Sequence, residues 1–221
     1  MRNAALSDVH GNLLSGAVRP RETADRLMQL DLPTVAGNHE RQLLTYDRAR
    51  MGYSDRLTHD AIDDTHRAWL AGLPPTLQPA DGALAFHGSP TDDLVYLLET
   101  VDPEGARPAT EAEVLERLGG AADVPLLLCG HTHLQRSVRL PTGALVVNPG
   151  SVGWPAYDDD HPHPHVMAAG TPYARYAIVD DTGGRWAVEF RAVDYDWDPA
   201  AADAEANGRP DVAGQLRTGR A

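Results

Sequence analysis

The sequence predicts an α/β fold, because short apolar runs alternate with helix-like segments between residues 4 and 133 and hairpin patterns follow. The apolar run at residues 126–129 ends at Gly130, His131 and His133. Such a run is typical of a buried strand. Ligands of α/β sheets bind just past the carboxyl ends of the strands. The two histidines therefore indicate either a metal site or only a hydrogen-bonded pair in a loop.

The composition is typical of a soluble globular protein, with 42% hydrophobic and 23% charged residues among 221. We expect one domain over residues 1–197 and a C-terminal helix with a polar tail over residues 198–221. The net charge of −13 argues against non-specific binding to nucleic acid or to an anionic membrane. Cys129 is the only cysteine, which excludes an internal disulfide and a thiolate metal site. Without a signal-peptide pattern or an apolar span, a cytoplasmic location is expected.

The first strand is expected at residues 4–6, and it leads to Asp8 and His10. A carboxylate and an imidazole at this spacing suit Zn, Mn or Fe, although Asp8 could equally accept backbone N–H groups in a turn. Pro20 is suited to the first turn of a helix, and residues 34–36 are predicted to form the next strand. Together these segments predict one βαβ unit.

The predicted strand at residues 34–36 leads into Gly37, Asn38, His39 and Glu40. Asn38 can offer its carbonyl oxygen to a metal, and His39 is a titratable group that can donate a proton. Two roles are open for Glu40. It could fix the tautomer of His39, or it could favour the positive N-terminus of the following helix.

The middle of the chain continues the alternation. Helices are expected over residues 41–51 with the leucines inward, from an N-cap at Thr58 to Leu73, and from a capping box at Thr110 through Leu118. A further strand at residues 83–86 ends at His87, so another histidine follows an apolar strand. His59 and His66 are interpreted as surface or core-edge residues and not as ligands.

Beyond residue 133 the pattern changes to hairpins. Antiparallel pairs are expected for residues 134–140 with 144–148 and for residues 175–179 with 185–193. Asp198 begins a polar C-terminal helix, and we expect the tail after residue 208 to be loosely held. The tract from Asp158 to His165 alternates histidine with proline after three aspartates. We interpret it as a solvated loop at the rim of the active site in preference to a metal site.

Four motifs stand at separate strand ends, with a fifth behind them. They are Ser7-Asp8-Val9-His10-Gly11-Asn12, Gly37-Asn38-His39-Glu40, His87-Gly88, Gly130-His131-Thr132-His133 and Asn148-Pro149-Gly150-Ser151. In this order they resemble the calcineurin-like metallophosphoesterase superfamily, and within it the YfcE-like bacterial phosphodiesterases. The resemblance implies an α/β fold in which two mixed sheets form a sandwich flanked by helices.

The resemblance also implies two metal sites and a general acid. The ligands would be Asp8, His10 and His133 for one ion and Asn38, His87 and His131 for the other. A metal-bound hydroxide would attack a small phosphodiester, and His39 would protonate the leaving group. The donors do not distinguish Mn, Fe, Zn and Ni.

One motif of the family is absent from the sequence. The family carries Gly-Asp between the first motif and Gly-Asn-His, and that aspartate bridges both metals. Here Asn12 continues directly into Leu13, as if one strand, one helix and the bridging carboxylate had been deleted. Neither Asp25 nor Asp31 falls at a predicted strand end. We therefore expect weakened metal binding, down to a single ion, and keep open a catalytically impaired metal- or phosphate-binding remnant.

Overall fold

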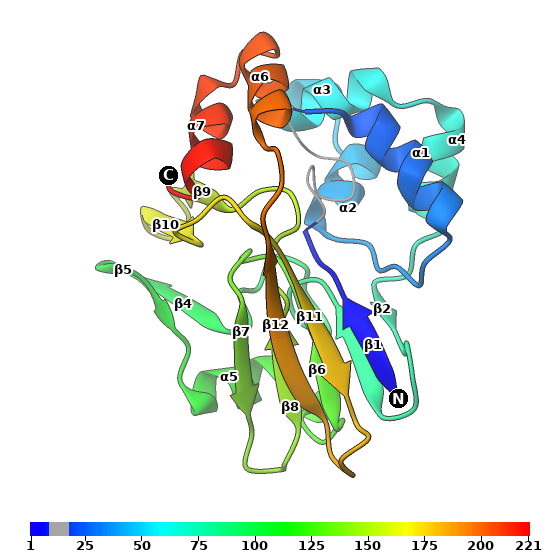
Figure 1. Ribbon diagram of the computed structural model, residues 1–221, viewed down its shortest axis with the longest axis vertical. Coiled ribbons are helices and arrows are strands. Elements are labelled where there is room, and N and C mark those ends of the chain that lie inside the picture. The colour runs from blue at the N-terminus through cyan, green and yellow to red at the C-terminus, as the bar shows by residue number, and fades with distance from the viewer. Residues whose placement is uncertain (9–17) are drawn as a thin grey trace.

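Two sheets pack face to face in the computed structural model, which describes residues 1–8 and 18–221 (Figure 1). The larger sheet has the order β2 (Thr76–Leu77), β3 (Ala83–Phe86), β6 (Leu126–Leu128), β8 (Leu145–Asn148) and β7 (Arg136–Arg139). Its three central strands are parallel, and both edge strands are antiparallel to their neighbours. The smaller, antiparallel sheet has the order β1 (Arg2–Ala5), β11 (Ala174–Asp180) and β12 (Ala187–Val193).

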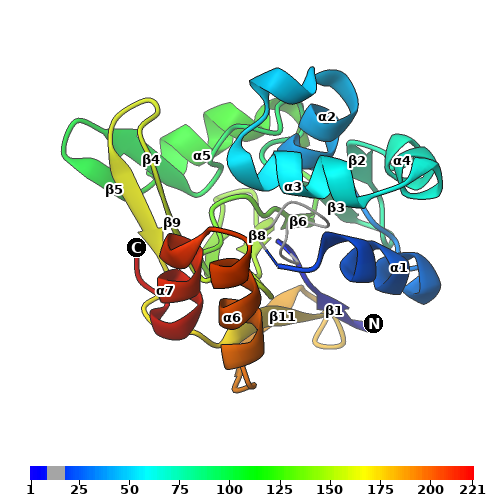
Figure 2. The same ribbon diagram turned by 90° about the horizontal axis from the view of Figure 1, so that it is seen from above.

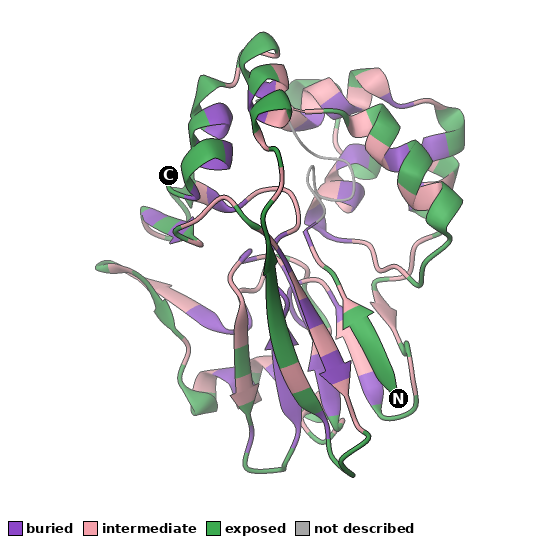
Figure 3. Ribbon diagram, in the orientation of Figure 1, coloured by how far each residue is buried: buried purple, intermediate pink, exposed green. Residues whose placement is uncertain are grey.

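Alternate residues of the central strands face two different cores, as the period of a strand requires. Leu126 packs with Ala177 and Val179 of the smaller sheet, whereas Leu127 packs with Val114 and Leu118 of α5 (Glu111–Leu118). The layers are therefore sheet, sheet and helix. Figure 3 shows the buried residues gathered where the sheets face each other and the exposed residues along β12. The predicted two-sheet α/β sandwich is confirmed.

The remaining elements flank this sandwich. They are α1 (Pro20–Leu30), α2 (Asn38–Thr45), η1 (Arg48–Arg50), α3 (Tyr53–Ala61), α4 (Asp64–Ala71), η2 (Gly119–Ala121), α6 (Asp198–Ala206), α7 (Pro210–Thr218) and the hairpins β4 (Glu99–Asp102) with β5 (Gly105–Pro108) and β9 (Ala156–Asp159) with β10 (His165–Ala168). Seen from above, α1, α3, α6 and α7 surround the ends of β6 and β8 (Figure 2). Among the described residues, no helix is long and apolar enough to cross a membrane.

The predicted strand at residues 34–36 and its βαβ unit are wrong. These residues form no ladder, and Ala36 N–H donates instead to the carbonyl of Pro74 at 2.9 Å. β2 pairs with β3 and forms the edge of the larger sheet on that side, so residues 34–36 do not pair with β3. β1 also joins the other sheet, where it pairs with β11.

The helix expected from Thr58 is also wrong. Thr58 lies inside α3, and a second helix, α4, begins after Asp63. The Asp63 side chain accepts the N–H groups of Thr65 and His66, and this capping box interrupts the apolar periodicity. His66, expected at the surface or at the edge of the core, is buried, and Leu44, expected inside, is exposed.

The C-terminal tail is not loosely held. Residues 210–218 form α7, which packs against α6 through a cluster of buried apolar side chains. The cluster consists of Ala201, Ala204, Val212, Ala213 and Leu216. Small apolar residues in a polar sequence give a weak amphipathic signal, which is why the prediction failed.

This packing predicts that Leu216→Ala lowers the free energy of unfolding by about 2–5 kcal/mol, because Leu216 is 1% exposed and its removal leaves a cavity. Urea denaturation followed by circular dichroism measures the change. Leu44→Ala, at a position 40% exposed, is the matched control and should change stability by less than about 0.5 kcal/mol. Equal effects of the two substitutions would contradict the packing of α7.

Candidate metal centre

The described site residues meet where β1, β3 and β6 end beside the start of α2. Asp8 follows β1, His87 follows β3, and residues 130–133 follow β6, while Asn38 is the first residue of α2. The ends of β1, β3 and β6 agree with the sequence prediction, whereas residues 34–36, expected to form a strand before Asn38, form none. His10 lies outside the described residues.

Three of the predicted ligands have left-handed backbone conformations. The φ angles are 47° at Asp8, 71° at His131 and 63° at His133. Within the described chain, the only other non-glycine residue with positive φ is Asp31, which caps the end of α1. Such conformations cost about 1–3 kcal/mol each and persist only where the surrounding structure enforces them. Their concentration here is typical of a functional site.

Hydrogen bonds enforce the conformation of Asp8. Its carboxylate accepts the His131 N–H at 3.1 Å and the Ser7 hydroxyl at 2.8 Å. Its backbone carbonyl accepts the hydroxyl of Ser151 at 2.8 Å. Gly130 permits this approach, since a Cβ there would lie 2.9 Å from Asp8 Oδ2. Asp8 is consequently fixed against the loop that carries the two histidines.

The second predicted ligand set converges closely. His87 Nε2 lies 2.9 Å from Asn38 Oδ1 and 3.2 Å from His131 Nδ1. Donor atoms at right angles around an ion, each about 2.1 Å from it, are about 3.0 Å apart. Both distances from His87 Nε2 are therefore compatible with donors to a common cation. Gly37 is needed for this fit, because a Cβ there would lie 2.9 Å from His87 Nδ1.

The first predicted set is represented by two described residues. His133 Nε2 lies 3.6 Å from Asp8 Oδ1, and His133 Nδ1 lies 2.8 Å from the carbonyl of Trp154. The carbonyl can only accept, so Nδ1 carries the proton and Nε2 presents its lone pair, as in many metal-bound histidines. No group of three His, Cys, Asp or Glu side chains suited to a metal occurs in residues 1–8 and 18–221. In the predicted sets the third donor is the Asn38 amide for one ion and His10, which lies outside the described residues, for the other.

Burial sets the charge state of the centre. It lowers the pKa of His87, His131 and His133 to about 3, so the imidazoles are neutral, the form that binds metals. Burial also raises the pKa of Asp8. A cation beside this carboxylate would compensate for its lost hydration. The chemistry of the donors therefore fits divalent metal ions.

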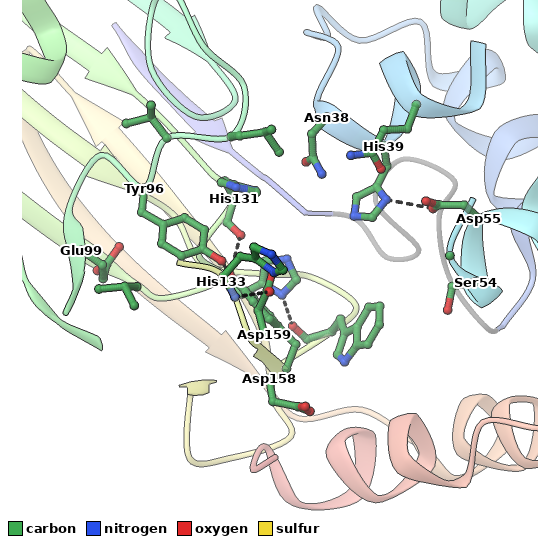
Figure 4. Close-up of a pocket in the computed structure, with 18 of the residues that line it drawn as sticks. Asn38, His39, Ser54, Asp55, Tyr96, Glu99, His131, His133, Asp158 and Asp159 are labelled. Carbon is green, nitrogen blue, oxygen red and sulfur yellow. Dashed lines mark hydrogen bonds and ion pairs between the residues drawn. The ribbon is translucent and has the colours of Figure 1, made fainter. Parts of the chain in front are cut away.

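His39 is held by a residue that the sequence analysis missed. Its Nδ1 lies 2.9 Å from Oδ1 of Asp55, a buried residue of α3 (Figure 4). Burial lowers the pKa of His39, but the hydrogen bond and charge of Asp55 outweigh it and the pKa is raised. Nothing in the spacing of the two residues indicates this pair, since it depends on how α2 packs against α3.

Glu40 takes the structural role of the two that were open. Its Oε2 accepts the N–H of Gly37 at 2.8 Å and so caps the start of α2. Burial raises the pKa of Glu40 to about 7. The tautomer of His39 is set by Asp55 instead. Arg41, on the same helix, binds Asp93 with two hydrogen bonds of 2.7 and 2.8 Å and ties α2 to the loop after His87.

The centre opens into a pocket of about 800 Å³. Its walls come from α2, α3, β4, the β9–β10 hairpin, α7 and the loops beside them; those nearest the histidines are Asn38, His39, Asp55, Tyr96, Trp154 and Tyr157. The expected position of the histidine-rich tract at the rim is confirmed, because Asp158, Asp159 and His161 line the pocket. Residues 160–164 of the tract form the loop that joins β9 to β10, and the other residues of the tract lie in these two strands.

Two tyrosines beside the histidines were also missed by the sequence analysis. Tyr96 and Tyr157 line the pocket, and burial raises the pKa of both phenols, that of Tyr96 to about 12. Both hydroxyls are therefore protonated at neutral pH. Neither belongs to a motif, and an aromatic residue between apolar neighbours is read first as core.

No family model matches the sequence, and no curated protein matches it in sequence. Two solved structures have the same fold along nearly the whole chain. A metallophosphoesterase from Sphaerobacter thermophilus has a TM-score of 0.71 and 22% identity, covering 99% of this chain and 100% of its own. A hypothetical protein from Pyrococcus horikoshii has a TM-score of 0.73 and 16% identity, covering 99% and 98%. At these identities the likeness shows a metallophosphoesterase-like fold, while the YfcE-like branch and the missing Gly-Asp motif stay predictions.

Proposed function

We propose that the protein is a divalent-metal-dependent phosphoesterase that hydrolyses small phosphodiesters. The observation that carries the proposal is the convergence of Asn38 Oδ1, His87 Nε2 and His131 Nδ1 within 2.9 and 3.2 Å at a strained turn. The fold likeness to a protein described as a metallophosphoesterase supports the same reaction class.

The chain offers donors for two ions. Asn38, His87 and His131 would hold one, and Asp8 and His133, with His10 from the sequence motif, would hold the other. When bound, divalent ions supply a water of lowered pKa as nucleophile and offset charge on the phosphoryl oxygens. Nitrogen and oxygen donors accept Mn, Fe, Zn or Ni.

His39 is suited to protonate the leaving group. It lines the pocket, and its Nδ1 is engaged by Asp55 at 2.9 Å, so Nε2 is the nitrogen that can face a substrate. The Asp55 carboxylate favours the charged imidazolium, the form that can donate a proton. Asp55 thus orients the acid and keeps it charged.

The charges of the pocket favour a diester over a monoester. Its lining carries the carboxylates of Asp55, Glu99, Asp158 and Asp159 and the guanidinium groups of Arg117 and Arg209. Both arginines are engaged within the protein, Arg117 by the carbonyls of Tyr96 and Glu99 and Arg209 by Asp211. Beyond the metal ions, the side chains of this lining offer little free positive charge for the second negative charge of a monoester, whereas a diester carries only one negative charge.

A second candidate is a metal- or phosphate-binding remnant with impaired catalysis. The observation that favours it concerns the two aspartates between Asp8 and Asn38. Asp25 bonds His66 at 3.0 Å, and Asp31 caps α1, so neither lines the pocket as a bridging ligand would.

Metal content and turnover separate the two candidates. We expect the protein dialysed with Mn²⁺ to retain the ion, as measured by inductively coupled plasma mass spectrometry. It should also hydrolyse bis(p-nitrophenyl) phosphate faster than p-nitrophenyl phosphate, and EDTA should abolish this turnover. Full occupancy by Mn²⁺ or Zn²⁺ without turnover would favour the remnant. Equilibrium dialysis that detects no bound divalent cation would contradict the metal centre itself.

The role of His39 has its own test. His39→Ala should lower kcat for the diester by about 10²–10⁴-fold, because the leaving group loses its proton donor. Mn²⁺ affinity should stay within about twofold, since His39 is not among the proposed ligands. His59→Ala is the matched control, because His59 lies outside the pocket lining and pairs with Asp60. Wild-type activity in His39→Ala would refute the assignment.

A further inference from the structure

One histidine of the Asp158–His165 tract points into the protein. His165, the first residue of β10, is 6% exposed. Its Nδ1 lies 2.8 Å from the carbonyl of His163, and its Nε2 lies 3.2 Å from the hydroxyl of Tyr96. His161 is exposed and lines the pocket rim. The inward residue is thus connected to the centre, although the tract itself binds no metal in the proposed function.

Tyr96 and Tyr157 continue this connection to the predicted ligands. Their hydroxyl oxygens lie 3.1 Å apart, and the Tyr157 hydroxyl donates to the carbonyl of His131 at 3.2 Å. The Tyr96 ring lies against His131, and the Tyr157 ring meets His133 edge-on, with centroids 4.8 Å apart in each pair. Each ligand histidine after β6 is therefore covered by one tyrosine.

One arrangement of the hydrogen atoms satisfies this series of hydrogen bonds. The His163 carbonyl can only accept, so His165 Nδ1 carries a proton, and in the singly protonated ring Nε2 can accept the hydroxyl hydrogen of Tyr96. The Tyr96 oxygen is then an acceptor. The Tyr157 hydrogen is shared between that oxygen and the His131 carbonyl. In this arrangement every acceptor in the series of hydrogen bonds has a donor.

The last acceptor in this series of hydrogen bonds belongs to His131, a residue with a strained backbone. His131 has a φ of 71°, and within residues 1–8 and 18–221 its carbonyl receives no hydrogen bond besides that of Tyr157. Removing the phenolic hydroxyl leaves the carbonyl of half-buried His131 without this donor and releases one of the contacts that hold the turn. The side chain of His131 would then lose its fixed approach to His87.

We propose that Tyr157, supported by Tyr96 and His165, is a positioning residue that holds His131 and His133 in their metal-binding geometry. The inference rests on the proposed metal centre. Tyr157 acts through the histidines and not on the substrate, so its effect appears in metal affinity. Outer partners of metal ligands typically contribute 10–100-fold to affinity or activity.

The test uses the full chain, with Mn²⁺ as the probe in isothermal titration calorimetry. Tyr157→Phe should weaken Mn²⁺ binding by about 10–100-fold. Tyr96→Phe, which keeps both rings and the hydroxyl on the His131 carbonyl, should weaken it less. Tyr173→Phe is the matched control, because this half-exposed tyrosine lies outside the pocket, and it should bind as the wild type does. The visible spectrum of bound Co²⁺ should change in Tyr157→Phe and not in the control.

The outcomes are distinct. Wild-type Mn²⁺ affinity and Co²⁺ spectrum in Tyr157→Phe would overturn the inference, while diester hydrolysis by the wild type would leave the proposed function intact. An equal loss in Tyr173→Phe would also overturn it, since the effect would then be general. A wild-type protein that binds no Mn²⁺ would overturn both proposals. If circular dichroism shows that Tyr157→Phe is unfolded, a wild-type affinity in folded Tyr96→Phe would overturn the support assigned to Tyr96 and His165.

Discussion

The structure depends on the hydrogen bonds between the Asp8 carboxylate and the N–H of His131. Asp8 follows β1 of the smaller sheet, and His131 follows β6 of the larger one, so the contact joins the two layers at their shared end. Ser7 and Ser151 add to the same junction. The left-handed conformations on both sides are stable only while this junction is intact, and the positions of the histidines follow from it.

The centre combines strain with desolvation. Three buried imidazoles are kept neutral, and a buried carboxylate stands among them without a cationic side chain in contact among the described residues. Such an arrangement is unfavourable for an empty core, where a well-packed apolar cluster would be more stable. A bound cation would offset the free-energy cost of burying these polar groups. The aromatic residues around it exclude water from the same side chains and strengthen their interaction with charge.

Much of the fold could be read from the sequence because it depends on local rules. The apolar run before Gly130 predicted β6, and the capping box at Thr110 predicted the start of α5. Asp8, His87 and the two histidines after β6 follow strands as predicted, whereas Asn38 follows no strand. The failures are non-local. Residues 34–36 join no sheet because β2 occupies the position beside β3, and Asp55 and Tyr157 reach the site only through helix and hairpin packing. No spacing rule encodes such contacts.

The candidate ligands are drawn from distant parts of the chain, from Asp8 to His133, and from both sheets. No short segment contains enough of them to hold an ion tightly, so the complete centre exists only after the sandwich has closed. A ligand that binds these groups together is therefore selective for the native state over the unfolded chain. By mass action it would stabilise the whole domain and not a single loop. Metal binding at the centre would thus raise the free energy of unfolding of the domain, in addition to any role in catalysis.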